Sequence, residues 1–191
     1  STQAKTLFPY TTLFRSVAWT PGRRYGAGGG RARAHGRGAR GAARVAMDDR
    51  AVVLVEDNPF DEELMLRAFK KAEVRGRVIT LRDGAEALDY FFAREAYAGR
   101  SLADVPLVVL LDLKLPKVDG LEVLRALRAD PRTKLLPIVI LTSSTEVADM
   151  QRSYQLGANS YVRKPNDFTA LVEVVRQLGA YWLGINRAAP V

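Results

Sequence analysis

The sequence of 191 residues lacks several features that define common protein classes. It has no cysteine, which excludes a disulfide framework and a thiolate metal site. No apolar run approaches the roughly 20 residues that span a membrane, so we expect a cytoplasmic protein without a membrane partner. The only histidine is His35, and the chain after that residue contains none.

Acidic residues are also missing from the first quarter of the chain. Residues 1–46 hold nine basic residues and no acid, whereas the remaining chain has 20 basic and 21 acidic residues. The overall net charge of +8 is typical of proteins that bind nucleic acids or anionic membranes. Because the excess belongs to residues 1–46 alone, we expect no nucleic-acid partner.

Residues 1–46 are rich in Gly, Ala and Arg and poor in branched apolar residues, so we expect this segment to be disordered. Within it, "TLFPYTTLFRS" (6–16) is similar to the in-frame translation of a common short-read sequencing adapter. We therefore expect residues 1–46 to be a translated, non-native segment, with a natural start at or near Met47 and one domain over 47–191. A genuine disordered basic tail is the alternative.

From residue 51, short apolar runs alternate with helical patterns. The runs are typical of strands buried on both faces of a sheet, and they occupy 51–55, 77–81, 107–111, 137–141 and 160–163. Helical patterns occupy 58–74, 83–93, 119–130, a segment after Ser143, and 166–183. This (βα)5 order predicts an α/β fold, namely a doubly wound parallel five-stranded sheet covered by helices on both faces.

Local signals mark two of the helix starts. Asn58 can cap the helix of 58–74, and Pro59 suits its first position. Ser143 and Glu146 have the spacing of a capping box, which predicts the start of the fourth helix.

Polar residues directly follow four of the predicted strands. They are Glu56 and Asp57, then Asp112, then Thr142 with Ser143, and finally Lys164 with Pro165. The carboxyl ends of parallel strands meet at one edge of a sheet, where such folds bind ligands, so these side chains are expected to converge.

The converging residue types indicate a chemistry. Carboxylates brought together repel one another unless a cation is present, and their oxygens suit Mg²⁺. A lysine and a hydroxyl beside them suit a phosphoryl group. Taken singly, Asp57 as a helix cap, Asp112 as a turn residue and Lys164 as a solvated surface charge are equally good interpretations, but the convergence favours a functional site.

These motifs resemble the receiver domain of bacterial two-component response regulators, the CheY-like group. The resemblance covers residues 51–183 and rests on "LVEDN", "LLDLKLPKVDGLEVLRALR", "PIVILTSS" and "SYVRKP", in that order. It implies a flavodoxin-like sheet with strand order 2-1-3-4-5. It also implies a signalling protein, not an enzyme in the usual sense, which promotes only its own phosphorylation and dephosphorylation.

The resemblance implies a role for each matching acidic residue. Asp112 would be the phosphoacceptor, a carboxylate that attacks the phosphorus of a phosphohistidine on a partner histidine kinase. Asp57, Asp112 and the backbone carbonyl of Lys114 would bind Mg²⁺, with Glu56 acting mainly through a water. Since the chain has no histidine after residue 46, the donor histidine would belong to the partner.

The resemblance also implies a phosphoryl-binding and switching set. Lys164 would pair with Asp112 and then with a phosphoryl oxygen, while Thr142 would hydrogen-bond the phosphoryl group. Tyr161 would be the aromatic residue that changes rotamer with it. The family's cis peptide bond would precede Pro165.

Finer similarity concerns the partner. "LVEDNPFDEELMLRAFKKA", "SYQLGANSYVRKPNDF" and "LGAYWL" are similar to small response regulators that accompany bacterial phytochrome-type histidine kinases. We therefore expect a stand-alone receiver that signals by altered docking or by phosphorelay, with a homodimer through the last helix region as an option. An apolar stripe of the last helix is expected in the core, and Tyr181 and Leu183 lie off it. The stripe comprises Phe168, Leu171, Val172, Val175, Leu178 and Trp182.

Two other functions use similar residues. A Mg²⁺-dependent aspartyl phosphohydrolase of the haloacid-dehalogenase type would need a second Asp at position 114, where this chain has Lys. A phosphorylation-independent binding module would be favoured by a disrupted pocket, but Asp57, Asp112, Thr142 and Lys164 are all present.

Overall fold

The structure is a computed structural model that describes residues 51–74, 76–187 and 189. The expectations for residues 1–46 and for a start near Met47 lie outside these residues. Within the described residues, no helix combines the length and the apolar character that crossing a membrane requires.

Five parallel strands form one sheet in the order β2-β1-β3-β4-β5, so the predicted sheet and its strand order are confirmed. The strands are β1 Val52–Val55, β2 Val78–Leu81, β3 Val108–Leu111, β4 Ile138–Thr142 and β5 Ser160–Arg163. One helix follows each strand, and these helices are α2 Pro59–Lys71, α3 Gly84–Phe92, α4 Gly120–Ala129, α5 Val147–Gln155 and α6 Phe168–Gly179. A short 3-10 helix, Glu95–Tyr97, lies in the loop before β3.

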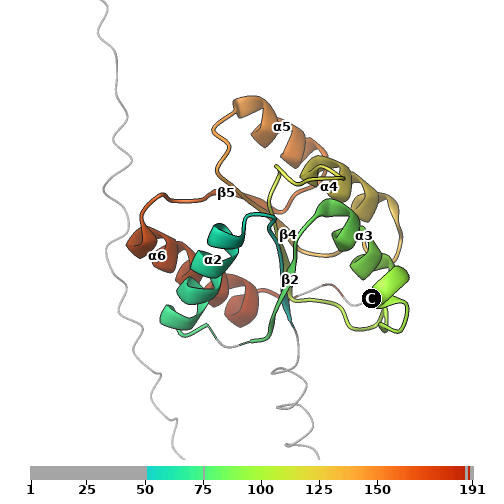
Figure 1. The fold of residues 1–191 in the computed structure, drawn as a ribbon, viewed down its shortest axis with the longest axis horizontal. Helices are drawn as coiled ribbons and strands as arrows, with labels where there is room; N and C mark the ends of the chain where they lie inside the picture. The colour runs from blue at the N-terminus through green and yellow to red at the C-terminus, as the bar shows by residue number, and fades with distance from the viewer. Residues whose placement is uncertain (1–50, 75, 188, 190–191) are drawn as a thin grey trace, which may run out of the picture. The chain divides into compact units, whose positions relative to one another are not determined.

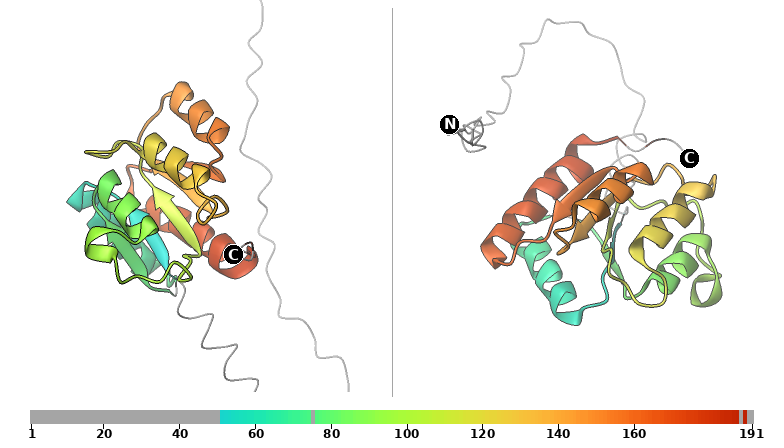
Figure 2. Two further views of the ribbon diagram at one scale, coloured as in Figure 1. Left: turned by 90° about the vertical axis from the view of Figure 1, so that its right-hand side faces the viewer. Right: turned by 90° about the horizontal axis from the view of Figure 1, so that it is seen from above.

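Helices cover both faces of the sheet, with α2 and α6 on one face and α3, α4 and α5 on the other (Figures 1 and 2). Alternate residues of β1 serve the two cores. Val52 and Leu54 pack with Met65 of α2 and Val175 of α6, whereas Val53 and Val55 join the core formed with α3 and α4. Burial on both faces explains why the three central strands, β1, β3 and β4, appear in the sequence as nearly continuous apolar runs.

The helix starts agree with the sequence in one case and differ in another. Asn58 caps α2 by accepting a hydrogen bond from the backbone N–H of Phe60, and Pro59 takes the first helical position. The predicted capping box is wrong, because α5 begins at Val147 and its cap residue Glu146 makes no side-chain capping bond. The segment before it instead forms the loop that follows β4.

The last helix changes from α-helical to π-helical geometry near its end. Asp167 caps α6, and a π-helical segment, Ala180–Ile185, continues from Gly179. The predicted apolar stripe lies in the core or packs against it, with Val175 fully buried and Phe168 and Leu178 partly buried. Tyr181 is half-exposed, whereas Leu183 is partly buried against the core.

Candidate functional site

Three of the predicted site residues meet at the carboxyl ends of their strands. Glu56 follows β1, Asp112 follows β3 and Lys164 follows β5. The Nζ atom of Lys164 lies 2.7 Å from Asp112 Oδ2 and also donates to Glu56 Oε2. Glu56 and Asp112 are buried and the Lys164 side chain is only 9% exposed, so the ion pairs are largely shielded from solvent.

The two oxygens of the Asp112 carboxylate face different partners. Oδ2 accepts from Lys164, while Oδ1 accepts from the backbone N–H of Leu113 at 2.6 Å and from that of Lys114 at 3.4 Å. Charge-assisted bonds of this kind are strong and directional, so they fix the orientation of a carboxylate. The Asp112 side chain is therefore held in one orientation at the end of β3.

Burial and charge act in opposite directions on the other two groups. Burial raises the pKa of Glu56 to about 7, even though the hydrogen bond from Lys164 lowers it. Burial lowers the pKa of Lys164, but Asp112 and Glu56 outweigh it and hold that pKa above its usual range. Lys164 therefore remains a cation at neutral pH.

A third carboxylate, which the sequence did not predict, also contacts this lysine. Asp61, in the first turn of α2, places Oδ2 at 3.1 Å from Lys164 Nζ. The only signal for it in the sequence is an acidic residue at a helix N-terminus, which the helix dipole explains equally well.

Thr142 and Tyr161 both contact the loop after β4. Thr142 is fully buried, and its Oγ1 accepts from the backbone N–H of Ser144 at 3.3 Å. The hydroxyl of Tyr161 donates to the Ser144 carbonyl at 3.5 Å. Ser144 Oγ in turn donates to Asp149 of α5 at 2.7 Å, so this loop connects the site to α5.

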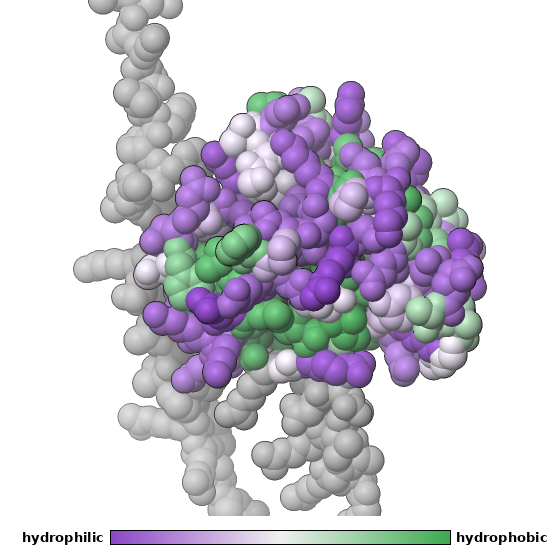
Figure 3. All heavy atoms as spheres, viewed as in Figure 1, coloured by the Kyte–Doolittle hydropathy of each residue, from purple (hydrophilic) through white to green (hydrophobic). Residues whose placement is uncertain are grey.

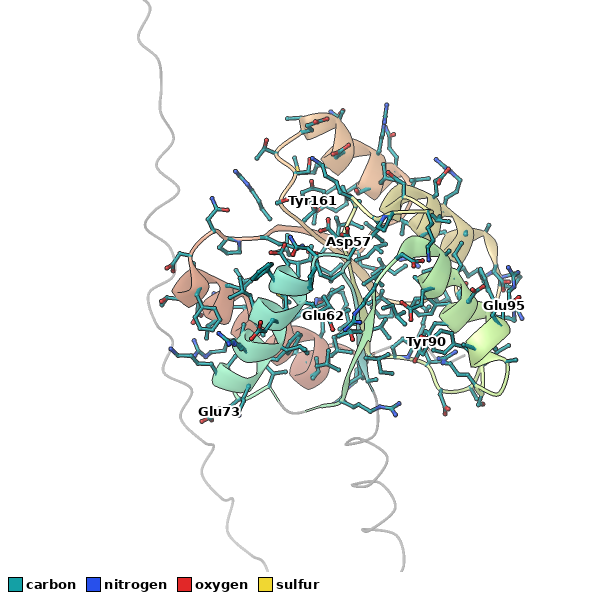
Figure 4. The ribbon with its side chains drawn as sticks, in the orientation of Figure 1. Asp57, Glu62, Glu73, Tyr90, Glu95 and Tyr161 are labelled. Atoms are coloured by element: carbon teal, nitrogen blue, oxygen red, sulfur yellow. The ribbon has the colours of Figure 1, made fainter. Side chains whose placement is uncertain are left out.

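Asp57 and Lys114 are exposed residues beside the buried set. Figure 4 shows Asp57 and Tyr161 at the same end of the molecule, with Glu73 at the opposite end of α2. The residue types fit a hard divalent cation, since the donors are carboxylate oxygens. Within the described part of the chain, no three acidic or histidine side chains are grouped for metal binding as they stand. The Lys164 ammonium contacts two of the carboxylates, those of Glu56 and Asp112.

The predicted cis bond before Pro165 is wrong. No peptide bond among the described residues is cis, so the Lys164–Pro165 bond is trans. The trans form of an X–Pro bond is favoured by about 0.5–1 kcal/mol unless the surroundings enforce the other isomer. With this trans bond, Lys164 Nζ still reaches Asp112 and Glu56.

A five-stranded parallel sheet with an oriented aspartate, a lysine and a buried threonine at the carboxyl ends of its strands defines an α/β protein with a polar site where such folds bind ligands. The sequence matches the family described as the response regulator receiver domain over residues 52–176. The chain belongs to this family, and it is thus a phosphoryl-accepting signalling receiver, not a classical enzyme.

Individual relatives agree with this assignment. The chain is 46% identical over 143 residues to the probable methanogenesis regulatory protein FilR2 of Methanothrix harundinacea, covering 75% of this chain and 90% of that protein. The Mn²⁺-bound form of response regulator Rcp1, a protein of Synechocystis sp., has a TM-score of 0.67 and 32% identity. The phosphorylated cyanobacterial phytochrome response regulator RcpA has a TM-score of 0.68 and 36% identity. Both structural matches cover 74% of this chain and 99% of the other.

Proposed function

We propose that Asp112 accepts a phosphoryl group from a phosphohistidine of a partner histidine kinase, and that residues 47–191 form the receiver domain. The observation that carries this proposal is the set of hydrogen bonds that orient Asp112. Its Oδ1 accepts from backbone N–H groups, and its Oδ2 accepts from the Lys164 ammonium at 2.7 Å. The phosphorylated state of RcpA, a similar protein, supports it.

The transfer needs positioning and charge neutralisation more than proton transfer. An Asp112 oxygen attacks phosphorus, the new O–P bond forms, and the P–N bond to the donor imidazole breaks with its electron pair going to nitrogen. Lys164 is already beside the nucleophile and can donate to a phosphoryl oxygen. The Thr142 hydroxyl lies at the end of the neighbouring strand β4 and can do the same.

A divalent cation, Mg²⁺ in our proposal, would be held by Asp57, Asp112 and the backbone carbonyl of Lys114, with Glu56 acting through a water. The cation would supply positive charge that offsets the carboxylates and the incoming phosphoryl oxygens. Rcp1, which has been solved with Mn²⁺ bound, supports a divalent cation in this family.

The phosphorylated state would be read through the loop after β4. The negative charge added at Asp112 would attract the Thr142 hydroxyl and the Lys164 ammonium. Thr142 and Tyr161 both hydrogen-bond the backbone of Ser144, so a shift of Thr142 would reach this loop and Tyr161. The adjoining helix α5 exposes an apolar stripe of Val147, Met150 and Tyr154. A change in the Ser144 loop is thereby passed to a surface that suits protein docking.

The kinase would be of the phytochrome type, as the similarity to RcpA supports. Next to the site, α2 exposes Phe60, with 76% of its surface accessible, and Leu64. Figure 3 shows hydrophobic side chains over α2 within an otherwise mostly hydrophilic face. An apolar surface beside the phosphoacceptor suits a kinase helix. We place this exchange in the cytoplasm, where a kinase obtains its phosphoryl group from ATP.

A homodimer would use the edge of the sheet at β5. A groove there is lined by Val162, Leu178, Tyr181 and Trp182, and β5 has no strand partner on its outer side within the described residues. Exposed strand edges with apolar neighbours favour association.

The test is phosphorylation of the full chain by a small phosphodonor with Mg²⁺, followed by intact mass. We expect a gain of one phosphoryl group that is abolished by chelator and by Asp112→Asn. If folded wild-type protein gains no mass, the chain instead acts as a phosphorylation-independent binding module.

A further inference from the structure

The Lys164 ammonium is shared by carboxylates from three different elements. It donates to Glu56 after β1, to Asp112 after β3 at 2.7 Å, and to Asp61 of α2 at 3.1 Å. An ammonium group has three N–H donors, and these three acceptors use all of them. Two of the acceptors belong to the proposed phosphorylation site, whereas Asp61 is in the first turn of α2 and has no role in that proposal.

We propose that Asp61 is a positioning residue that holds Lys164 in place from α2 when Glu56 and Asp112 are engaged by a divalent cation. This inference rests on the proposed function, because a bound cation and Lys164 are both positive and compete for the same two buried carboxylates. Asp61 gives the lysine a third partner outside that competition. Lys164 then remains near Asp112 without having to be released into solvent.

The burial of the two groups supports this role. The Lys164 side chain is only 9% exposed, while that of Asp61 is 37% exposed, so a largely buried cation faces a partly solvated anion. Ion pairs at a fully exposed surface contribute little, but a pair with one buried member is screened much less. Asp61 is therefore poised to influence where the lysine charge lies.

The alternative is that Asp61 only complements the dipole of α2. Glu63 provides the matched control for this alternative, since it lies two residues further along the same helix and carries the same charge. It pairs with Arg67 at 2.7 Å and is exposed. A general electrostatic or helix-stabilising effect would be shared by Asp61 and Glu63, whereas an effect through Lys164 would belong to Asp61 alone.

The first measurement is the affinity of the full chain for Mn²⁺. The electron paramagnetic resonance signal of free Mn²⁺ reports how much of the ion remains unbound during a titration. In Asp61→Asn, Lys164 is left to Glu56 and Asp112 alone and competes more strongly with the cation. We expect about three- to tenfold weaker Mn²⁺ binding. Glu63→Gln should bind as the wild type does, and Asp61→Glu should recover most of the loss.

The second measurement needs no cation. Proton exchange of the ¹⁵N-labelled Lys164 ammonium, observed by NMR in the metal-free protein, should be faster in Asp61→Asn than in wild type or Glu63→Gln. Wild-type Mn²⁺ affinity and unchanged exchange in Asp61→Asn would overturn the inference. Equal losses in Asp61→Asn and Glu63→Gln would overturn it as well. If wild-type protein itself fails to bind Mn²⁺, the cation part of the proposed function fails, and the exchange rates alone decide whether Asp61 holds the lysine.

Discussion

Gly120 lies directly against the backbone of Asp112. A Cβ atom at position 120 would come within 2.1 Å of the Asp112 carbonyl oxygen and 2.7 Å of the Leu113 Cα. The Gly120 N–H also donates to the Leu113 carbonyl at 2.9 Å, which joins the start of α4 to the end of β3. The absence of a side chain at Gly120 thus allows the end of β3 and the start of α4 to approach closely.

Gly120→Ala should therefore damage both stability and phosphorylation. The contact is with backbone, which cannot swing aside, so we expect a loss of about 1–3 kcal/mol in the free energy of unfolding. Slower phosphorylation should accompany it because Asp112 is displaced. Urea unfolding and the rate of mass gain measure the two effects. Gly99→Ala, where nothing lies within 4 Å of the added Cβ, is the control and should change neither. A Gly120→Ala variant that unfolds like the wild type would show that the close approach is not needed.

The raised pKa of Glu56 predicts a pH dependence of stability in the absence of divalent cations. Burial raises the pKa of Glu56 to about 7 in the folded protein, whereas the ordinary pKa of a glutamate side chain is 4.5. Between these values the folded state binds more protons than the unfolded state, so stability falls as pH rises. We expect this to remove about 3 kcal/mol between pH 4.5 and 7, an effect that Glu56→Gln abolishes. Urea unfolding with chelator, across that pH range, compares the two proteins. Parallel curves for wild type and variant would contradict the assignment.

Much of the site could be predicted because it depends on backbone topology. Parallel strands place their carboxyl ends together, so the residues after β1, β3 and β5 had to converge once the strands were recognised. The meeting of Glu56, Asp112 and Lys164 follows from that rule and is confirmed.

The remaining features depend on contacts that no local pattern records. Asp61 and Lys164 are 103 residues apart in the sequence. They meet only because of the way α2 packs on the sheet. The later start of α5 reflects the Ser144 side chain, which accepts from the Glu146 N–H and donates to Asp149 instead of leaving a cap at Ser143. The bond before Pro165 is trans. The cis and trans isomers of an X–Pro bond differ little in free energy, so the sequence alone does not decide between them.

Replacing the shared lysine should destabilise the protein strongly unless a cation takes over its charge. Lys164→Met leaves the buried Glu56 and Asp112 without a positive partner, and we expect a loss of about 3–5 kcal/mol at neutral pH in chelator. Divalent cations should restore part of it, since in our proposal the cation is held at the same carboxylate site. Thermal and urea unfolding with and without Mg²⁺ provide the measurement.

A matched lysine separates burial from charge in this experiment. Lys117 pairs with Asp83 at 2.5 Å but is 67% exposed, so Lys117→Met should cost less than about 1 kcal/mol and show no rescue by Mg²⁺. Equal losses in the two variants would mean that burial of the Lys164 pairs contributes nothing.

Arg128 tests whether stability and phosphorylation can be separated. Its guanidinium donates to the carbonyls of Gly157, Lys134 and Leu136 and to Asn159 Oδ1, and these bonds join α4 to the loops that enter β4 and β5. Those loops are at the opposite ends of the strands from Asp112. Arg128→Met should lower the free energy of unfolding by about 1–3 kcal/mol, because it leaves several carbonyls without a donor. The rate of Asp112 phosphorylation, measured by mass well below the unfolding transition, should stay at the wild-type value. A slower rate in fully folded protein would show that the two ends of the sheet are coupled.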